Sequence, residues 1–93
     1  MPVEVRLPSM LRIHVQGQSS LEVKGETVGE VLENLAKENP GMTGQIVDGE
    51  GVLRKFVNVY VNDDDIRYLN QLDTKLSSGD VITILPAVAG GGW

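Results

Sequence analysis

The fold is decided by the stretch FVNVYVN, residues 56–62. Valine stands at every second position of this stretch, and β-branched and aromatic side chains favour the extended backbone of a strand. Successive side chains of a strand point to opposite faces of the sheet. The stretch therefore predicts a central strand that turns Val57, Val59 and Val61 toward a covering helix.

A second strong strand follows further along the chain. Gly79 and Asp80 form a turn signal, and the apolar, largely β-branched stretch 81–85 comes directly after them. Its alternation predicts that Ile82 and Ile84 face the core. The other face then carries Val81, Thr83 and Leu85.

The beginning of the sequence predicts an antiparallel hairpin. Residues 3–7 alternate apolar and charged side chains, and Pro8 ends this strand because proline has no amide hydrogen to donate. Residues 21–24 alternate again, and Gly25 supplies the following turn. The connecting loop leaves two alternatives open, because its apolar residues either extend the first strand or cover the edge of the core. These residues are Leu11, Ile13 and Val15.

One helix is predicted between the hairpin and the strand at 56–62. Thr27 and Glu30 fit a capping box, in which the threonine hydroxyl accepts from an exposed amide and the glutamate reaches back to the cap. The sequence Asn-Pro-Gly at 39–41 ends the helix. Gly29 in the first turn indicates a close approach to a strand. The apolar stripe of the helix consists of Val28, Val31, Leu32, Leu35 and Ala36.

The remaining segments complete the predicted fold. Residues 42–55 form a loop with at most a short helical turn, and residues 64–76 hold a short strand around Ile66. This order of elements predicts an α+β fold, the ubiquitin-like β-grasp, with a mixed sheet of four to five strands and one main helix. We expect a β-grasp domain at residues 1–85 and a flexible, glycine-rich C-terminal tail at 86–93.

The composition excludes several classes of function. The 93 residues suffice for one domain, and the absence of cysteine excludes disulfides and thiolate metal sites. A net charge of −5 is repelled by phosphate backbones, which argues against nucleic acid and favours an electropositive protein partner. No stretch approaches the roughly 18 apolar residues of a membrane span, and we recognise no leader, so we expect a cytoplasmic protein with no membrane partner.

No constellation of side chains predicts catalysis or a bound metal. His14 is the only histidine in the sequence, which excludes a multi-histidine site. The aspartate run at 63–65 lacks the alternating ligands and the glycine of a calcium loop, and it is typical of a hairpin end. The glycine-rich segment 48–51 lacks the lysine of a phosphate loop and predicts a flexible turn.

The tail predicts a different kind of chemistry. The sequence PAVAGGGW at 86–93 holds three consecutive glycines, which can pass through a channel too narrow for other residues. Fully extended, residues 86–91 reach roughly 20 Å, enough to carry a chain end into the active site of another protein. The large indole of Trp93 would block such an entry.

Residues 56–63 and 79–91 resemble the MoaD/ThiS family of ubiquitin-like sulfur carriers. In this family the carboxylate of a Gly-Gly end is adenylated and then converted to a thiocarboxylate. Within the family the two segments are most similar to the carrier that donates sulfur to a pyridoxal-phosphate (PLP)-dependent cysteine synthase.

The resemblance implies a role for each residue of the tail. The mature end of such carriers, Ala-Gly-Gly, corresponds to Ala89, Gly90 and Gly91, so the thiocarboxylate falls on Gly91 while Ala89 and Gly90 thread the channel. Gly92 and Trp93 depart from the pattern. Some relatives carry a short extension that a JAMM-type zinc metalloprotease removes, and the same processing is implied here.

The resemblance also implies a protein cosubstrate and not an enzyme. An E1-like adenylyltransferase would spend ATP on the tail, a sulfur-accepting synthase would use the product, and the carrier itself would bind no cofactor. Two alternatives stay open, the small subunit of molybdopterin synthase and a ubiquitin-like protein modifier. We expect partners to dock on the sheet face away from the helix, at Leu85, Phe56, Tyr60 and Arg6.

Overall fold

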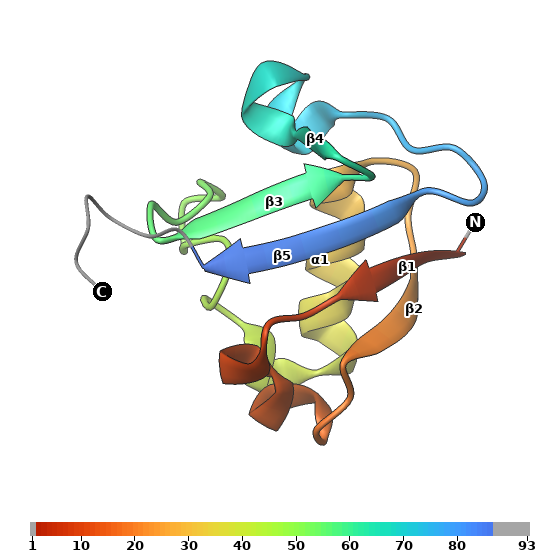
Figure 1. The fold of residues 1–93 in the computed structure, drawn as a ribbon. Coiled ribbons are helices and arrows are strands. Elements are labelled where there is room, and N and C mark those ends of the chain that lie inside the picture. The colour runs from red at the N-terminus through yellow and green to blue at the C-terminus, as the bar shows by residue number, and fades with distance from the viewer. Residues whose placement is uncertain (1, 87–93) are drawn as a thin grey trace.

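The structure, a computed structural model, describes residues 2–86, in which one helix packs across a five-stranded sheet (Figure 1). The strands are β1 (Pro2–Arg6), β2 (Ser20–Lys24), β3 (Val57–Val61), β4 (Asp64–Asp65) and β5 (Val81–Pro86), and the helix is α1 (Val28–Glu38). Four short 3-10 helices lie in the connections: η1 (Ser9–Val15), η2 (Pro40–Met42), η3 (Ile66–Tyr68) and η4 (Gln71–Asp73). These elements form the predicted ubiquitin-like β-grasp.

The sheet is mixed, with the strand order β2-β1-β5-β3-β4. β1 pairs antiparallel with β2 and parallel with β5, and β3 pairs antiparallel with β5 and with β4. Figure 1 shows β5 in the middle of the sheet, between β1 and β3. The strand predicted at 56–62 is an interior strand, between β5 and β4, but the parallel pairing with β1 gives the centre of the sheet to β5.

Helix α1 begins and ends as its sequence predicts. The Thr27 hydroxyl accepts a hydrogen bond of 3.1 Å from the Glu30 backbone N–H, and the helix stops at Glu38, before Pro40. The Glu30 carboxylate accepts from the backbone N–H of Glu26, at 3.1 Å, and so reaches one residue further back than a capping box requires. Glu33 and Lys37, which are one helical turn apart, form an outward-facing ion pair at 3.2 Å.

The core lies between α1 and the sheet. It receives the helix stripe and every second residue of the strands, among them Val5, Val59 and Ile82, which are 0% exposed. The loop after β1 forms η1, in which Leu11 and Val15 are buried while Ile13 stays 80% exposed. Of the two open alternatives for this loop, the structure takes the one in which it covers the edge of the core.

Three expectations differ from the structure. The short strand β4 precedes Ile66, which starts a 3-10 helix and is fully buried. Gly29 does approach another segment closely, but a Cβ at this position would lie 3.1 Å from the Leu72 carbonyl oxygen of η4, not against a strand. Pro86, assigned to the tail, pairs with Val57 as the last residue of β5. The rest of the predicted tail, residues 87–93, lies outside the described residues.

The turn from β2 into α1 offers a test of the packing. A Cβ on Gly25 would lie 2.6 Å from Val31 Cγ2 and 2.8 Å from the Val31 backbone nitrogen. We expect Gly25→Ala to lower the free energy of unfolding by about 1–3 kcal/mol, because the backbone must move to accept the methyl group. Gly49→Ala is the control, because a Cβ there meets nothing within 4 Å. Urea denaturation of both variants measures the difference, and equal stabilities would contradict the close approach.

Candidate functional site

The sheet face opposite α1 is the first candidate site. Strand pairing sets Arg6 beside Thr83 and Thr83 beside Tyr60, so a row of three side chains crosses β1, β5 and β3 on this face. Leu85 lies opposite Asn58 in the same way. Three of the four residues expected at a partner surface therefore share one face, as their alternation predicts.

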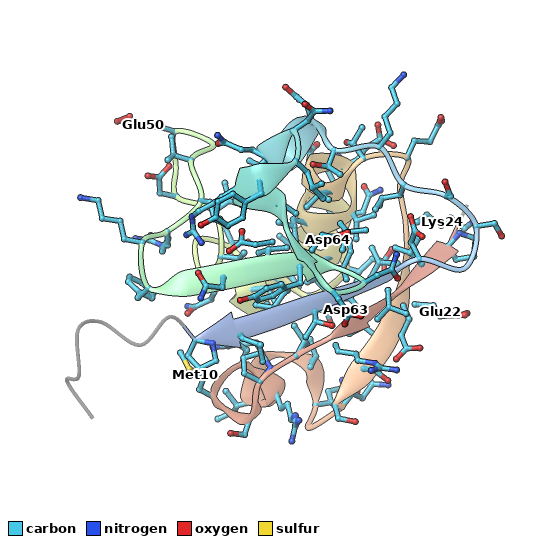
Figure 2. All side chains as sticks on the ribbon, turned by 45° about the horizontal axis from the view of Figure 1, so that its top comes forward. Met10, Glu22, Lys24, Glu50, Asp63 and Asp64 are labelled. Atoms are coloured by element: carbon cyan, nitrogen blue, oxygen red, sulfur yellow. The ribbon has the colours of Figure 1, made fainter. Side chains whose placement is uncertain are left out.

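Exposed apolar side chains gather at the end of this face where the chain leaves β5. Leu85 is 44% exposed, and Phe56, which directly precedes Val57, the partner of Pro86, is 54% exposed. Met10 of η1 is 52% exposed and lies toward the same end of β5 (Figure 2). Exposed apolar groups beside the exit of the chain are typical of a docking surface.

The arginines of this face are held in place by neighbours. Arg6 Nε donates to a Glu4 carboxylate oxygen at 2.7 Å, and this hydrogen bond and the nearby negative charge raise the pKa of Arg6. Arg67 donates to the Asn58 side-chain oxygen and, at 3.0 Å, to the Val57 carbonyl oxygen. A guanidinium that is already ordered loses less entropy when it binds a carboxylate of a partner.

A groove of about 300 Å³ runs beside this end of β5. It lies between β5 and the segment from β1 into η1, and Arg6, Arg12 and Leu85 line it. Arg12 Nε donates to the Leu7 carbonyl oxygen at 3.1 Å. The sequence analysis missed Arg12, because a 3-10 helix leaves no hydrophobic period that would have placed it.

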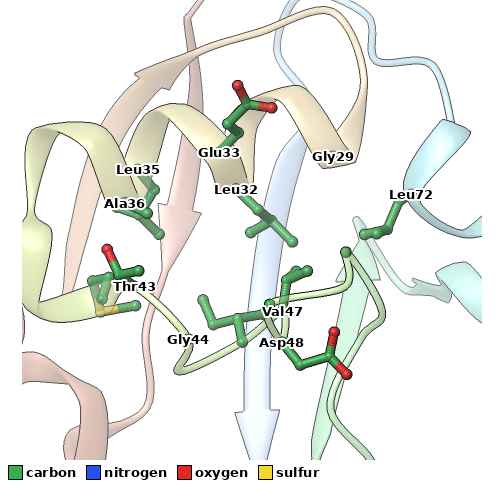
Figure 3. A pocket seen from close by; sticks show the side chains of 14 residues that line it. Gly29, Leu32, Glu33, Leu35, Ala36, Thr43, Gly44, Val47, Asp48 and Leu72 are labelled. Carbon is green, nitrogen blue, oxygen red and sulfur yellow. The ribbon is translucent and has the colours of Figure 1, made fainter.

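A second candidate site lies on the helix side, as a cavity of about 420 Å³ between α1 and segment 43–51 (Figure 3). Apolar side chains form most of its wall. They are Leu32, Leu35, Ala36, Met42, Ile46, Val47 and Leu72. The sequence analysis gave no sign of this cavity, because a loop without a periodic pattern forms one side of it.

The turn at 48–51, which borders this cavity, is fixed by hydrogen bonds. The Asp48 carboxylate accepts from the backbone N–H groups of Val52, at 3.0 Å, and Glu50, at 2.8 Å. These bonds lower the pKa of Asp48, because they favour its ionised form. A lowered pKa in the folded state means that the bonds stabilise the turn above the unfolded pKa and lose this effect as the pH falls through the folded pKa.

Other residues singled out in the sequence form no site. His14 is half-buried in η1, against Gly41, and Asp63 and Asp64 are exposed. Within residues 2–86 no group of three or more histidine, aspartate or glutamate side chains is placed to hold a metal ion. No helix in this part of the chain is long and apolar enough to cross a membrane. The tail residues Ala89, Gly90, Gly91, Gly92 and Trp93 lie outside the described residues.

The fold and the surface together define a ubiquitin-like β-grasp domain. Its last strand, β5, forms part of an open sheet face. The sequence pattern of the ThiS family matches residues 5–91. The chain therefore belongs to the ThiS family and is a ubiquitin-like sulfur carrier, as the resemblance of residues 56–63 and 79–91 predicted.

Individual relatives support this assignment. The sulfur carrier protein CysO of Mycobacterium tuberculosis is 44% identical over 93 residues, with 98% of this chain and 100% of the relative covered. Its crystal structure superimposes with a TM-score of 0.87 at 42% identity, over 92% of this chain and 99% of that one. CysO in the BexX/CysO complex of Amycolatopsis orientalis also gives 0.87, at 44% identity over 96% and 99%. The small archaeal modifier protein 3 of Haloferax volcanii is 34% identical, over 98% of this chain and 100% of the relative.

Proposed function

We propose that this protein carries sulfur as a thiocarboxylate on the carbonyl carbon of Gly91. The observation that supports it best is the extent of the family match, which reaches Gly91 and leaves out Gly92 and Trp93. Ala89 and Gly90 pass through the narrow entrance of the partner's active site. A protease, of the JAMM type by resemblance, first removes the residues after Gly91.

The proposed chemistry needs no catalytic side chain from this chain. The Gly91 carboxylate attacks ATP on an E1-like enzyme, which releases pyrophosphate and leaves an acyl-adenylate. A sulfur donor then displaces AMP, and the product is a thiocarboxylate. This group is ionised at neutral pH and is a sulfur nucleophile without the help of a general base. The carrier is thus a cosubstrate that works where ATP is available, in the cytoplasm.

The proposed acceptor is a PLP-dependent cysteine synthase, and the likeness to CysO proteins supports it. The thiocarboxylate sulfur would add to an aminoacrylate held by that enzyme and form a thioester. The amine of the new cysteine would then attack the thioester carbonyl, which leaves cysteine joined to Gly91 by an amide bond. Hydrolysis of this amide would release cysteine and return the carrier.

The proposed docking surface is the open sheet face around Leu85, Phe56, Tyr60 and Arg6. This proposal is supported by the arrangement at the end of β5, where exposed apolar groups lie next to the start of the tail. That CysO of Amycolatopsis orientalis forms a complex with BexX supports a stable partner for this fold. The E1-like enzyme and the acceptor synthase must both reach the tail. We therefore propose that they bind this face one after the other.

A second candidate function is attachment to other proteins as a modifier. The likeness to a small archaeal modifier protein favours it, and the same adenylated Gly91 would start both reactions. The two functions differ in the product. A modifier forms isopeptide bonds to lysine, which appear as ladders on a denaturing gel, whereas a sulfur carrier gives a thiocarboxylate and no ladder.

The position of the activated carboxylate can be tested with two chain ends. We expect a chain that ends at Gly91 to gain sulfur in place of one oxygen when it is incubated with ATP, a competent E1-like enzyme and sulfide. The chain that ends at Trp93 should stay unchanged, because its terminal indole clashes with a channel sized for glycine. Intact-mass spectrometry distinguishes the two results. Sulfur on the chain that ends at Trp93 would refute the processing step, and its absence from both chains would refute the carrier proposal.

The docking surface can be tested with charge at its apolar end. We expect Leu85→Asp to weaken binding to the E1-like enzyme at least about tenfold, because a carboxylate then replaces an apolar contact. Thermal unfolding should change little, because Leu85 is 44% exposed. Ile13→Asp is the matched control, since Ile13 is 80% exposed on η1 and should bind as the unchanged chain does. Equal affinities in a calorimetric titration of the two variants would argue against this face.

A further inference from the structure

The cavity on the helix side has no part in the function proposed above. It lies between α1 and segment 43–51, and buried Leu32, Leu35, Met42 and Ile46 form its floor (Figure 3). Its volume of about 420 Å³ could take a large apolar side chain. Ligand sites of proteins have roughly 300–1,000 Å³ and are mostly apolar, so the size and lining fit a binding site.

The cavity continues into a groove. Gly51 and Leu72 line both the cavity and a neighbouring hollow of about 740 Å³ between segments 51–55 and 66–73. Two apolar residues of this groove are exposed, Val52 at 56% and Leu69 at 41%. An apolar cavity that opens into a groove with further apolar contacts fits an extended polypeptide better than it fits a small molecule.

Carboxylates stand at the mouth of the cavity. Glu33 of α1 and Asp48 of the loop both belong to its lining and lie on opposite sides of it in Figure 3, and the lining within residues 2–86 contains neither lysine nor arginine. Lys37 balances Glu33 only in part, since this pair is exposed to water. The Asp48 carboxylate is held in place by two backbone N–H groups, and the positive charge of Arg54, which donates to the Gly44 carbonyl oxygen, offsets its charge in part. An apolar group with a positive charge beside it is complementary to this lining.

We propose that the cavity and the groove together form a second docking surface, which binds an extended segment of a partner protein. One apolar side chain of that segment enters the cavity, and neighbouring lysine or arginine side chains pair with Glu33 and with Asp48. The rest of the segment follows the groove past Val52 and Leu69. The surface adjoins the open sheet face at Arg67, which lines the groove and also donates to Asn58 and Val57 of β3. Its existence does not depend on the sulfur chemistry.

The test is a titration of the ¹⁵N-labelled full chain with a synthetic peptide, acetyl-Lys-Lys-Leu-Lys-Ser-Ser-amide. We expect saturable shifts of the amide signals of Leu32, Ala36, Val47 and Leu72. Alanine in place of the leucine should weaken binding at least about tenfold, because the cavity then stays largely unfilled. Glutamate in place of the lysines should weaken it as well, because like charges then meet at the mouth.

Two pairs of variants locate the peptide on the protein. Val52→Ser should weaken binding about threefold or more by removing a groove contact, whereas Ile13→Ser, an exposed residue of η1, should not change it. Glu33→Gln should weaken binding about two- to fivefold, whereas Glu38→Gln, an exposed residue of the same helix that does not line the cavity, should have no effect.

Several results would overturn the proposal. Equal binding of the leucine and alanine peptides would show that the cavity is not the site, and so would shifted signals that belong to β1, β3 and β5 alone. Shifts at Leu32, Ala36 and Val47 that grow with protein concentration in the absence of peptide would identify a second copy of the chain as the occupant. Binding of n-hexylammonium as tight as that of the peptide would identify a small-molecule site.

Discussion

The parallel pairing of β1 with β5 is the constraint on which the rest of the structure depends. It joins the beginning and the end of the described chain, with Val5 beside Ile82, and makes β5 the middle strand of the five. A central strand is hydrogen-bonded along both edges and is the part of a sheet least ready to unfold. The residues after Pro86 therefore follow a strand that is hydrogen-bonded along both edges, which suits the tail insertion proposed above.

The pairing also determines what each face of β5 does. Ile82 and Ile84 are buried beneath α1, whereas Thr83 and Leu85 belong to the open face. One strand thus contributes to the core and, in the proposed docking, to recognition, through alternate residues. A carrier that delegates its chemistry to a terminal carboxylate has no need of catalytic side chains on the domain. What the domain must supply is a surface that partners recognise and a fixed point from which the tail starts.

Both signs of charge meet on the open face, where Arg6 pairs with Glu4 and Arg67 with Asp65. The chain is acidic overall, and each of its four guanidinium groups is held by a neighbour. The fourth, Arg54, donates to the Gly44 carbonyl oxygen and lies 5.9 Å from the centre of the Phe56 ring. Arginines that are ordered in advance favour carboxylates of a partner at this face. The electropositive partner expected from net charge suits the acidic mouth of the helix-side cavity better.

Local patterns predicted most of the fold and little of the site. Alternation gave β1, β3 and the two faces of β5, and the stripe from Val28 to Ala36 gave α1, because each of these elements buries one side. The position of β5 at the centre depends on a pairing between residues far apart in the sequence, which no local pattern encodes. Arg12, the groove beside it and the helix-side cavity all depend on loops and 3-10 turns, whose side chains follow no period.

The presence of two candidate surfaces bears on how a carrier is passed between enzymes. In the proposed function the activating enzyme and the acceptor both need the tail and the face beside Leu85. Each would then have to release the carrier before the other could bind, and tight binding at this face would slow the cycle. A contact on the helix side would not compete with either of them. A segment bound there would raise the effective concentration of the carrier at an adjoining enzyme, to the millimolar range for a short flexible link. Weak contacts at the sheet face would then suffice, and they permit fast exchange because a weak complex dissociates quickly.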